Sequence, residues 1–432
     1  MEREPLLTLA VIFGGQLMHA KMWLFGLVAL GAVAAHAQDL TITNARIIDG
    51  TGRVIERGSV VIRGGKIASV ASGAPTAAAG RRIDAGGKTV MPGLIDAHRH
   101  LVTGDAAKWL ADTAPKELQD FLDAGFTTVL SAIDPPPIIE ARKQIEAGKL
   151  KGPRLFTGTF IPVAGATGPP PVDDPARTDA SRGPRNGPPA PAIPRDATIQ
   201  QVQAAKRAGY DYLKVVLVMT PGGPELNTLK LIVDEGKKIG MPTIVHAVSV
   251  IDTLTAIEAH PDVLVHTPHI GRLDEDPYAI RKIVEAKIPM TSTLSVFGPH
   301  FGHENTPLFR DAKPFPWHTL SSAGQGPVNA RLLVNNGLVS YGYGTDTQWP
   351  PKETLLDELR ELDLVFSPTE IVTFITKGAA ASTLHQTEIG TLEAGKFGDV
   401  VIIDGDPLTD SHALLHVTTT IKGGEVVFQA KR

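Results

Sequence analysis

Residues 91–100 read Met-Pro-Gly-Leu-Ile-Asp-Ala-His-Arg-His, an apolar run that ends in two histidines separated by one residue. Side chains two residues apart on a β-strand lie on the same side, so His98 and His100 can both reach one metal ion. Asp96 shares this side, and we expect it to be a structural partner rather than a ligand. Such pairs also occur by chance, so their meaning depends on the rest of the chain.

Beyond this stretch, apolar runs of strand length alternate with amphipathic stretches of helical length. This pattern indicates parallel strands joined by crossover helices. The eight expected strands are residues 93–98, 127–132, 154–159, 212–217, 243–246, 263–266, 289–293 and 338–344. The clearest helices are expected at residues 106–124, 224–240, 270–286 and 352–364. Eight such repeats predict an α/β fold, a (β/α)8 TIM barrel, rather than an open doubly wound sheet.

Both ends of the chain differ from this middle region. Short alternating runs, separated by glycine-rich turns, lie at residues 40–44, 59–63, 66–70, 399–404, 418–422 and 425–428. They predict short antiparallel strands. We expect residues 38–92 and 388–432 to form one small β-sandwich, and residues 93–387 to form the barrel.

The composition restricts the chemistry. The 432 residues suffice for a barrel of about 250 residues and a smaller unit. The chain has 42 Lys and Arg and 46 Asp and Glu, and no block of like charge. Because the charges nearly balance, nucleic acid is not an expected partner. The chain has no cysteine, so any metal must be held by histidine, carboxylate or modified lysine.

Residues 1–37 predict a signal peptide. Two apolar runs, 6–18 and 22–35, are each shorter than the roughly 20 residues of a membrane-spanning helix, and the second ends in Ala35-His36-Ala37, like a cleavage site. We expect translation to start at Met18 or Met22. The mature protein is then periplasmic or secreted, without a stable membrane anchor.

Two connections are unusually long. Residues 162–194 are rich in proline, which excludes a helix, and residues 295–327 carry several aromatic residues. In a barrel both would leave the carboxyl ends of strands, where active sites are built. We therefore interpret them as a lid or a pocket wall.

Four further residues lie within or at the ends of the predicted strands. Lys214 interrupts an apolar strand, where a neutral buried amine can react with carbon dioxide to form a carbamate that bridges two cations. The alternative is a lysine that reaches solvent. His246 and His266 end two consecutive strands, and Asp346 ends the eighth. Asp346 alone could cap a helix or form a turn, but beside a metal it would be a ligand and proton shuttle.

Substrate contacts are less defined. His269 lies three residues beyond His266 and is a candidate contact, with a loop histidine as the alternative. Arg99 is a candidate for binding a substrate carboxylate, although solvation at the surface is the commoner role of arginine. The exposed faces of the barrel helices do not reveal a dimer interface, so homo-oligomerisation stays open.

These residues together resemble the amidohydrolase superfamily, specifically its imidazolonepropionase-like and prolidase-like branch. The resemblance covers nearly all of residues 40–427. It rests on residues 91–100, the Lys of Tyr212-Leu-Lys-Val, His246, His266, Gly344-Thr-Asp and the C-terminal segment 390–408.

The resemblance implies a binuclear centre. His98, His100 and Asp346 would hold one metal, His246 and His266 a second, and carbamylated Lys214 would bridge them. Zinc suits ligands rich in histidine, with manganese, cobalt and iron as alternatives. A metal-activated hydroxide would attack the substrate, and Asp346 would transfer the proton.

Amide hydrolysis is the favoured activity. Deaminases of this superfamily usually carry an acid where this chain has Ser249. We expect a metal-dependent amidohydrolase that cleaves an amide C–N bond of a small molecule, such as an N-acyl amino acid, an X-Pro dipeptide or an ochratoxin-like aryl amide. The alternatives are a deaminase, cyclic amidase or lactonase on the same scaffold, and a non-catalytic metal-binding protein.

Overall fold

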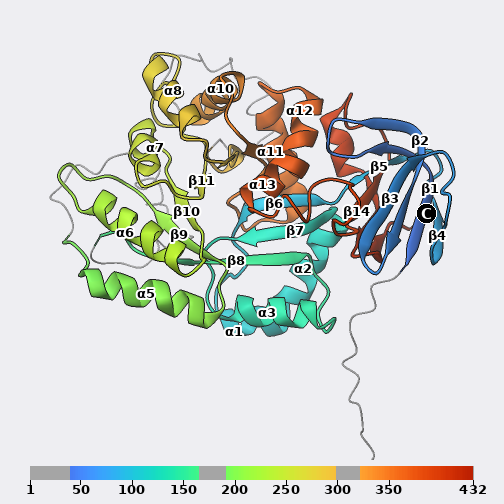
Figure 1. Cartoon of the computed structure of the whole chain (residues 1–432), viewed down its shortest axis with the longest axis horizontal. Coiled ribbons are helices and arrows are strands. Elements are labelled where there is room, and N and C mark those ends of the chain that lie inside the picture. Colours follow the sequence, from blue (N-terminus) through green and yellow to red (C-terminus); the bar gives the residue numbers. More distant parts are fainter. Residues whose placement is uncertain (1–38, 165–190, 298–321, 432) are drawn as a thin grey trace, which may run out of the picture. The chain divides into compact units, whose positions relative to one another are not determined.

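The computed structural model describes residues 39–164, 191–297 and 322–431 (Figure 1). The predicted signal peptide and most of the proline-rich connection lie outside the described residues. Within the described part of the chain, no helix combines the length and the apolar character needed to cross a membrane.

Eight parallel strands form a nearly closed barrel. They follow chain order around the sheet: β6 (Leu94–Arg99), β7 (Phe126–Ser131), β8 (Arg154–Phe160), β9 (Tyr212–Val216), β10 (Thr243–His246), β11 (Val263–Val265), β12 (Met290–Thr291) and β13 (Tyr341–Gly342). The first and last strands also approach each other, because the amide of Ala97 donates to the carbonyl of Tyr343 at 3.0 Å. The predicted TIM barrel is confirmed.

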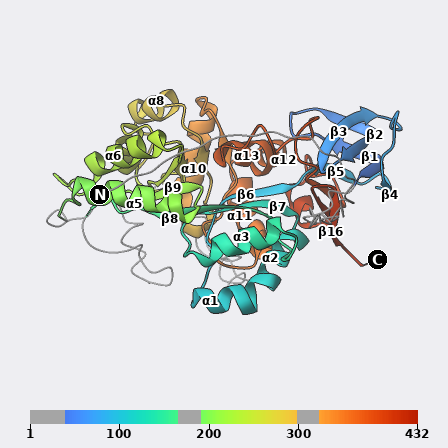
Figure 2. The same ribbon diagram turned by 60° about the horizontal axis from the view of Figure 1, so that its bottom comes forward.

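Helices connect these strands and cover the barrel. The longer ones are α2 (Ala114–Asp123), α3 (Pro137–Glu146), α5 (Arg195–Ala208), α6 (Glu225–Lys238), α7 (Val250–Ile257), α8 (Pro277–Glu285), α10 (Ser322–Asn335) and α11 (Pro351–Asp363). Short α1 (Ala106–Lys108) continues through a π-helical turn into α2, and α12 (Pro368–Thr373) continues likewise into α13 (Ala379–Ser382). Figure 2 shows α2 and α3 beside β7. Their apolar faces supply much of the buried core, including Leu118, Phe121 and Ile138.

Two predicted boundaries are wrong. The helix expected at residues 270–286 begins at Pro277, because Asp276 caps it by accepting from the amide of Ala279 and proline suits the first helical turn. The connection expected to run to Pro327 ends earlier, because α10 begins at Ser322 and contains that proline. A helix tolerates such a proline at the cost of a backbone hydrogen bond.

A second sheet unites the two ends of the chain. Its strands are β1 (Leu40–Ile48), β2 (Val54–Arg63), β3 (Lys66–Ser72), β4 (Arg81–Asp84), β5 (Thr89–Pro92), β14 (Val400–Ile403), β15 (Val417–Lys422) and β16 (Glu425–Gln429). The order is β16-β15-β14-β5-β1-β2-β3, with β4 also beside β1. In Figure 1 the blue N-terminal strands lie beside the red C-terminal ones.

This second sheet is mixed rather than antiparallel throughout. β5 is antiparallel to β14, but β1 is parallel to β4 and β5. The sequence could not distinguish these arrangements, because alternating burial is the same for a parallel and an antiparallel strand. An apolar cluster that includes Ile42, Val60 and Val400 packs on this sheet. The domain boundaries at residues 92/93 and 387/388 stay predictions.

Candidate metal centre

Asp346 lies at the centre of a buried group of histidines. One oxygen of its carboxylate is 2.7 Å from His100 Nε2 and 3.3 Å from His98 Nε2, and the other is 3.9 Å from His266 Nε2. Donor atoms of His98, His266 and Asp346 all lie within 4.8 Å of one another. The ends of β6, β11 and β13 thus bring together residues that are 248 positions apart in the sequence, from His98 to Asp346.

Local backbone geometry permits this approach. A Cβ atom at Gly344 would lie 3.0 Å from the Cβ of His98, so glycine lets the end of β13 pass closely beside β6. His266, Thr293 and Asp346 have φ values of 90°, 45° and 52°, which non-glycine residues rarely adopt. Such strained residues concentrate at functional sites.

His246 and Lys214 complete the group. The rings of His246 and His266 lie 4.4 Å apart between centroids, and those of His98 and His266 lie 4.9 Å apart. Lys214 on β9 places its Nζ 3.0 Å from His98 Nε2 and is only 1% exposed. This burial excludes the alternative of a lysine that reaches solvent.

The protonation states suit cation binding. Burial, together with the charge of Lys214, lowers the pKa of His98 to about 3 and that of His246 well below its usual value. Burial also lowers the pKa of His266 well below its usual value. Burial alone would raise the pKa of Asp346, but hydrogen bonds from His100 and His98 hold it far below. The site therefore offers neutral imidazoles beside an ionised carboxylate.

Two ring nitrogens support the fit of a metal directly. Within the described residues, the Nε2 atoms of His246 and His266 are buried and have no hydrogen-bond partner. Buried polar atoms are rarely left unsatisfied in proteins. For His266, Nδ1 lies 2.8 Å from Thr293 Oγ1; with the proton assigned to Nδ1, the lone pair of Nε2 faces the cluster. The residues present therefore fit a divalent cation.

Asp96 is a structural partner, as expected. Its carboxylate accepts hydrogen bonds from Thr345 Oγ1 at 2.7 Å and from the amides of His98 and Thr345 at 3.2 Å each. These bonds tie β6 to the segment that carries Asp346. Burial raises the pKa of Asp96 to about 6.

Arg99 lies apart from the group around Asp346. It is buried, and its guanidinium donates to the hydroxyl oxygens of Thr345, Thr347 and Thr354 and to the carbonyl of Trp349. These partners belong to the segment between β13 and α11 and to the first turns of α11. The contacts are those of a residue that orders the segment after Asp346, whereas a contact with substrate was expected.

His269 lies beside the group. Its buried ring stacks on the ring of Phe297 with a centroid distance of 3.9 Å and an interplanar angle of 21°. Phe297 also meets His266 edge to face at 5.3 Å. A role of His269 in substrate binding stays a prediction.

Some supporting residues were not foreseen. Thr293 orients His266, and the buried Glu358 on α11 accepts from the backbone amides of Leu294 and Ser295. Asp134 accepts from the amide of Val102 at 2.9 Å, just beyond His100, and burial raises its pKa to about 6. A buried acid after a strand end was the available signal for Asp134, whereas the contacts of Thr293 and Glu358 depend on the fold.

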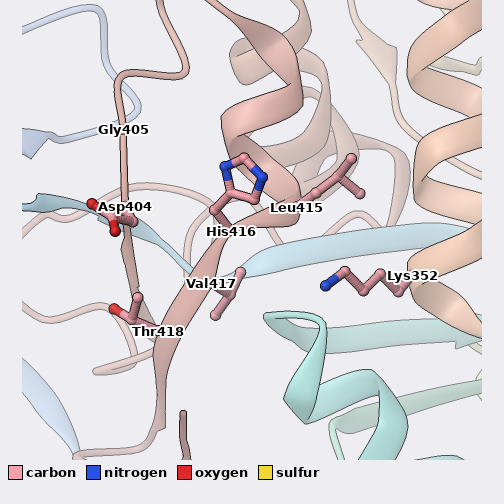
Figure 3. Close-up of a pocket in the computed structure, with 7 residues that line it drawn as sticks. All are labelled: Lys352, Asp404, Gly405, Leu415, His416, Val417 and Thr418. Carbon is pink, nitrogen blue, oxygen red and sulfur yellow. The ribbon is translucent and has the colours of Figure 1, made fainter. Parts of the chain in front are cut away.

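A separate hollow of about 500 Å³ shares no residue with this group (Figure 3). It is lined by Lys352, Asp404, Gly405, Leu415, His416, Val417 and Thr418. It is widely open, and its charged side chains Lys352 and Asp404 are exposed. We assign it no part in the chemistry.

Comparison with known proteins decides the family. Residues 89–427 match the Amidohydrolase family. The chain belongs to the amidohydrolase family. His98, His100, His266 and Asp346 form a buried metal-binding cluster typical of such proteins. The chain is accordingly a metal-dependent hydrolase of the amidohydrolase superfamily, as the sequence motifs indicated.

Two curated relatives match most of the chain. The 5-methylthioadenosine/S-adenosylhomocysteine deaminase of Halalkalibacterium halodurans is 25% identical over 425 residues, which cover 89% of this chain and 90% of the relative. The imidazolonepropionase of Shouchella clausii is 25% identical over 430 residues, covering 87% of this chain and 86% of the relative.

Solved structures share the fold. A putative prolidase from Bifidobacterium longum superposes with a TM-score of 0.71 at 24% identity, covering 92% of this chain and 96% of the other. The ochratoxinase of A. niger gives a TM-score of 0.69 at 22% identity, with coverage of 91% and 96%. At these identities the likeness shows the fold alone.

Proposed function

We propose that this amidohydrolase cleaves an amide C–N bond of a small molecule and that Asp346 carries the proton. The observation behind this proposal is the position of the Asp346 carboxylate, which is buried within 4 Å of three histidine nitrogens. A carboxylate that is ionised in the resting site can accept a proton from water and deliver it to a leaving amine.

We propose two divalent ions as the cofactors, with zinc favoured by the histidine ligands. His98, His100 and Asp346 would hold one ion, His246 and His266 the other, and Lys214 would bridge them as a carbamate formed with carbon dioxide. When bound, such ions polarise a substrate carbonyl and lower the pKa of water. The 1% exposure of Lys214 among histidines supports the carbamate, because burial favours the neutral amine that reacts with carbon dioxide.

Residues of the chain also contribute to the proposed reaction by orienting the Asp346 carboxylate and by excluding water. Asp96 holds the backbone and side chain of Thr345, the residue before Asp346, so the Asp346 carboxylate is already oriented when substrate arrives. The burial of the histidines keeps competing water away from their nitrogens and strengthens their interactions with charge. We further propose export to the periplasm or the medium, which the N-terminal sequence supports.

A deaminase is the second candidate, because the curated deaminase of H. halodurans matches 89% of this chain. The position that carries an acid in deaminases is Ser249 here. Its hydroxyl donates to Asp252 at 2.6 Å and caps α7. An oxygen committed to a helix cap in this way is poorly placed to protonate a leaving group, which favours the amidase.

The test combines metal analysis with a substrate panel. The purified protein should contain about two ions per chain, and it should hydrolyse an N-acyl amino acid, an X-Pro dipeptide or an aryl amide in a reaction that a chelator abolishes. Asp346→Asn should fold with an unchanged far-UV spectrum but lose at least a hundredfold in kcat. Ammonia release from aminopurines without amide hydrolysis would replace the amidase with the deaminase.

A separate variant tests the carbamate. Lys214→Ala should lose both metal content and turnover, because the bridging anion is gone. Short carboxylic acids such as propionate should restore part of the activity by occupying the same space. A Lys214→Ala protein with full metal content and full activity would contradict the bridging role.

A further inference from the structure

Phe297 lies beside His266 of the metal-binding cluster and beside His269. It ends a short 3-10 helical turn, Ser295–Phe297, that follows β12. Its ring stacks on His269 at 3.9 Å and contacts His266 edge to face at 5.3 Å. Because His266 belongs to the cluster, a substrate held there would lie within van der Waals reach of this aromatic pair.

Exposure differs between Phe297 and the two histidine rings that it contacts. His266 and His269 are 1% and 3% exposed, whereas Phe297 is only half-buried. Of these three residues, Phe297 is therefore the one that stays partly accessible, while the two imidazoles are buried. A hydrocarbon ring gains little from contact with a small polar group but favours burial against an apolar or aromatic one.

A buried carboxylate fixes the turn that carries Phe297. Glu358 on α11 accepts from the amide of Leu294 at 2.9 Å and from that of Ser295 at 2.8 Å. Glu358 is fully buried, so its bonds to these two amides are shielded from competing water. This tether holds the Phe297 ring in place before any ligand arrives, which lowers the entropic cost of packing a substrate against it.

We propose that Phe297 and His269 form an aromatic wall that selects substrates with an aromatic or large apolar group next to the scissile carbonyl. This inference rests on the proposed amidase function and narrows its substrate class. With such a wall, we expect poor turnover of amides whose two substituents are both small or both charged. Phe297 provides the contact, His269 supports the ring from below, and Glu358 is a positioning residue.

The test uses matched amides that differ in a single group. One pair is the N-benzoyl and N-acetyl derivatives of the same amino acid, and the other is the acetamides of aniline and of methylamine. The wild-type protein should prefer the aromatic member of at least one pair by tenfold or more in kcat/KM. Phe297→Ala should reduce that preference at least tenfold. Phe297→Leu should retain an intermediate preference.

Controls separate loss of the wall from loss of folding. Tyr278→Ala removes an aromatic ring that is 56% exposed on α8. It should leave the aromatic-to-small ratio of kcat/KM unchanged for both amide pairs. Metal content of the Phe297 variants should equal that of the wild type. Unchanged aromatic-to-small ratios in a Phe297→Ala protein with full metal content would overturn the inference.

A binding measurement distinguishes this inference from the proposed function. Benzoate should bind the metal-loaded wild type at least tenfold more tightly than acetate by calorimetry, and Phe297→Ala should lose that difference. If neither amide pair is hydrolysed but benzoate shows this behaviour, the amidase proposal fails and the aromatic wall stands. Equal binding of benzoate and acetate by the wild type would contradict the wall.

Discussion

At the scale of single residues, Asp346 and His266 show how the fold prepares ligands in advance. Both have backbone conformations that L-residues seldom adopt, with φ values of 52° and 90°. Each is also held by hydrogen bonds to neighbours, with the amide of Asp346 donating to the carbonyl of His98 at 2.7 Å. Such backbone conformations cost free energy of folding. Their presence at these two residues indicates that the backbone orients ligands at the expense of stability.

Thr293 is the residue whose removal should weaken metal binding without removing a ligand. In Thr293→Val the side chain keeps its shape, but His266 loses the partner of Nδ1 and can rotate or change tautomer. We expect a 10- to 100-fold loss of zinc affinity, measured by competition with a chromogenic chelator. Thr267→Val is the matched control, because its buried hydroxyl bonds Tyr341 instead of a ligand. Equal affinity losses in the two variants would show that Thr293 has no specific role.

The residues of the cluster were predictable because each lies within or ends an apolar strand. Lys214 and the histidines needed only the assumption that strand ends meet at one face of a barrel. A substrate contact of Arg99 stays a prediction, and strand alternation puts Arg99 on the opposite side from His98 and His100. Phe297 belongs to the connection that we interpreted as a lid or a pocket wall, but its contacts and those of Thr293 and Glu358 could not be placed, because they depend on distant strands and helices.

At the scale of elements, the segment between β13 and α11 depends on Arg99. This buried side chain bonds three threonine hydroxyls and the carbonyl of Trp349, so it spans the segment from Thr345 to the first turns of α11. Asp346 lies inside the same segment. Its position is therefore coupled to an arginine on another strand.

Arg99→Met should loosen this segment and destabilise the protein. The variant removes the donor to several buried threonine hydroxyls and the positive charge that lies 3.9 Å from the carboxylate of Asp96. We expect a loss of about 3–5 kcal/mol in the free energy of unfolding and faster amide exchange across residues 345–349. Arg272→Met, which removes a surface ion pair with Asp274, should leave amide exchange across residues 345–349 unchanged. If amide exchange across residues 345–349 is unchanged in Arg99→Met, the segment does not depend on Arg99.

Helix α11 carries a second buried acid with a pH-dependent effect. Burial, with the nearby charges of Glu358 and Asp357, raises the pKa of Glu361 from 4.5 to about 8. Between these values the folded protein keeps a proton that the unfolded chain releases, so the stability present at acid pH is lost as pH rises toward 8. Glu361→Gln should abolish this loss and be more stable than the wild type at pH 8.5, by at least about 1 kcal/mol.

Denaturant unfolding at pH 5 and pH 8.5 measures this difference. The exposed Glu353 on the same helix provides the control, because Glu353→Gln should behave like the wild type at both values. A stability gain of Glu361→Gln that is equal at pH 5 and pH 8.5 would contradict a titrating Glu361.

The elements themselves were predictable to different degrees. All eight barrel strands lie where the apolar runs placed them, although β12 and β13 are only two residues long. Helix starts were harder to place, because α8 begins later than expected, at Pro277 after its cap Asp276, and α10 begins at Ser322 inside a region that resembles a loop. The parallel pairing of β1 with β5 could not be derived, because the alternation of buried and exposed residues is the same in parallel and antiparallel strands.

At the scale of the whole molecule, metal and fold should stabilise each other. The cluster joins strands from across the barrel, and no such arrangement exists in an unfolded chain. Zinc at 100 times its dissociation constant should add about 2.7 kcal/mol to the free energy of unfolding. Calorimetry with a chelator and then with added zinc should show a rise in the unfolding temperature. His385→Ala, outside the cluster, should show the same rise, and absence of any rise in the wild type would contradict metal binding by the native state.

The mixed sheet has a consequence for the order of synthesis. β5 lies between β1 and β14 in the finished sheet, yet residues 93–399 separate β5 from β14 in the chain. On the ribosome, the first five strands emerge long before β14 exists, so one edge of β5 stays open throughout translation of the barrel. An open strand edge is a template for pairing with other chains. The nascent protein is therefore exposed to aggregation in a way that the completed molecule is not.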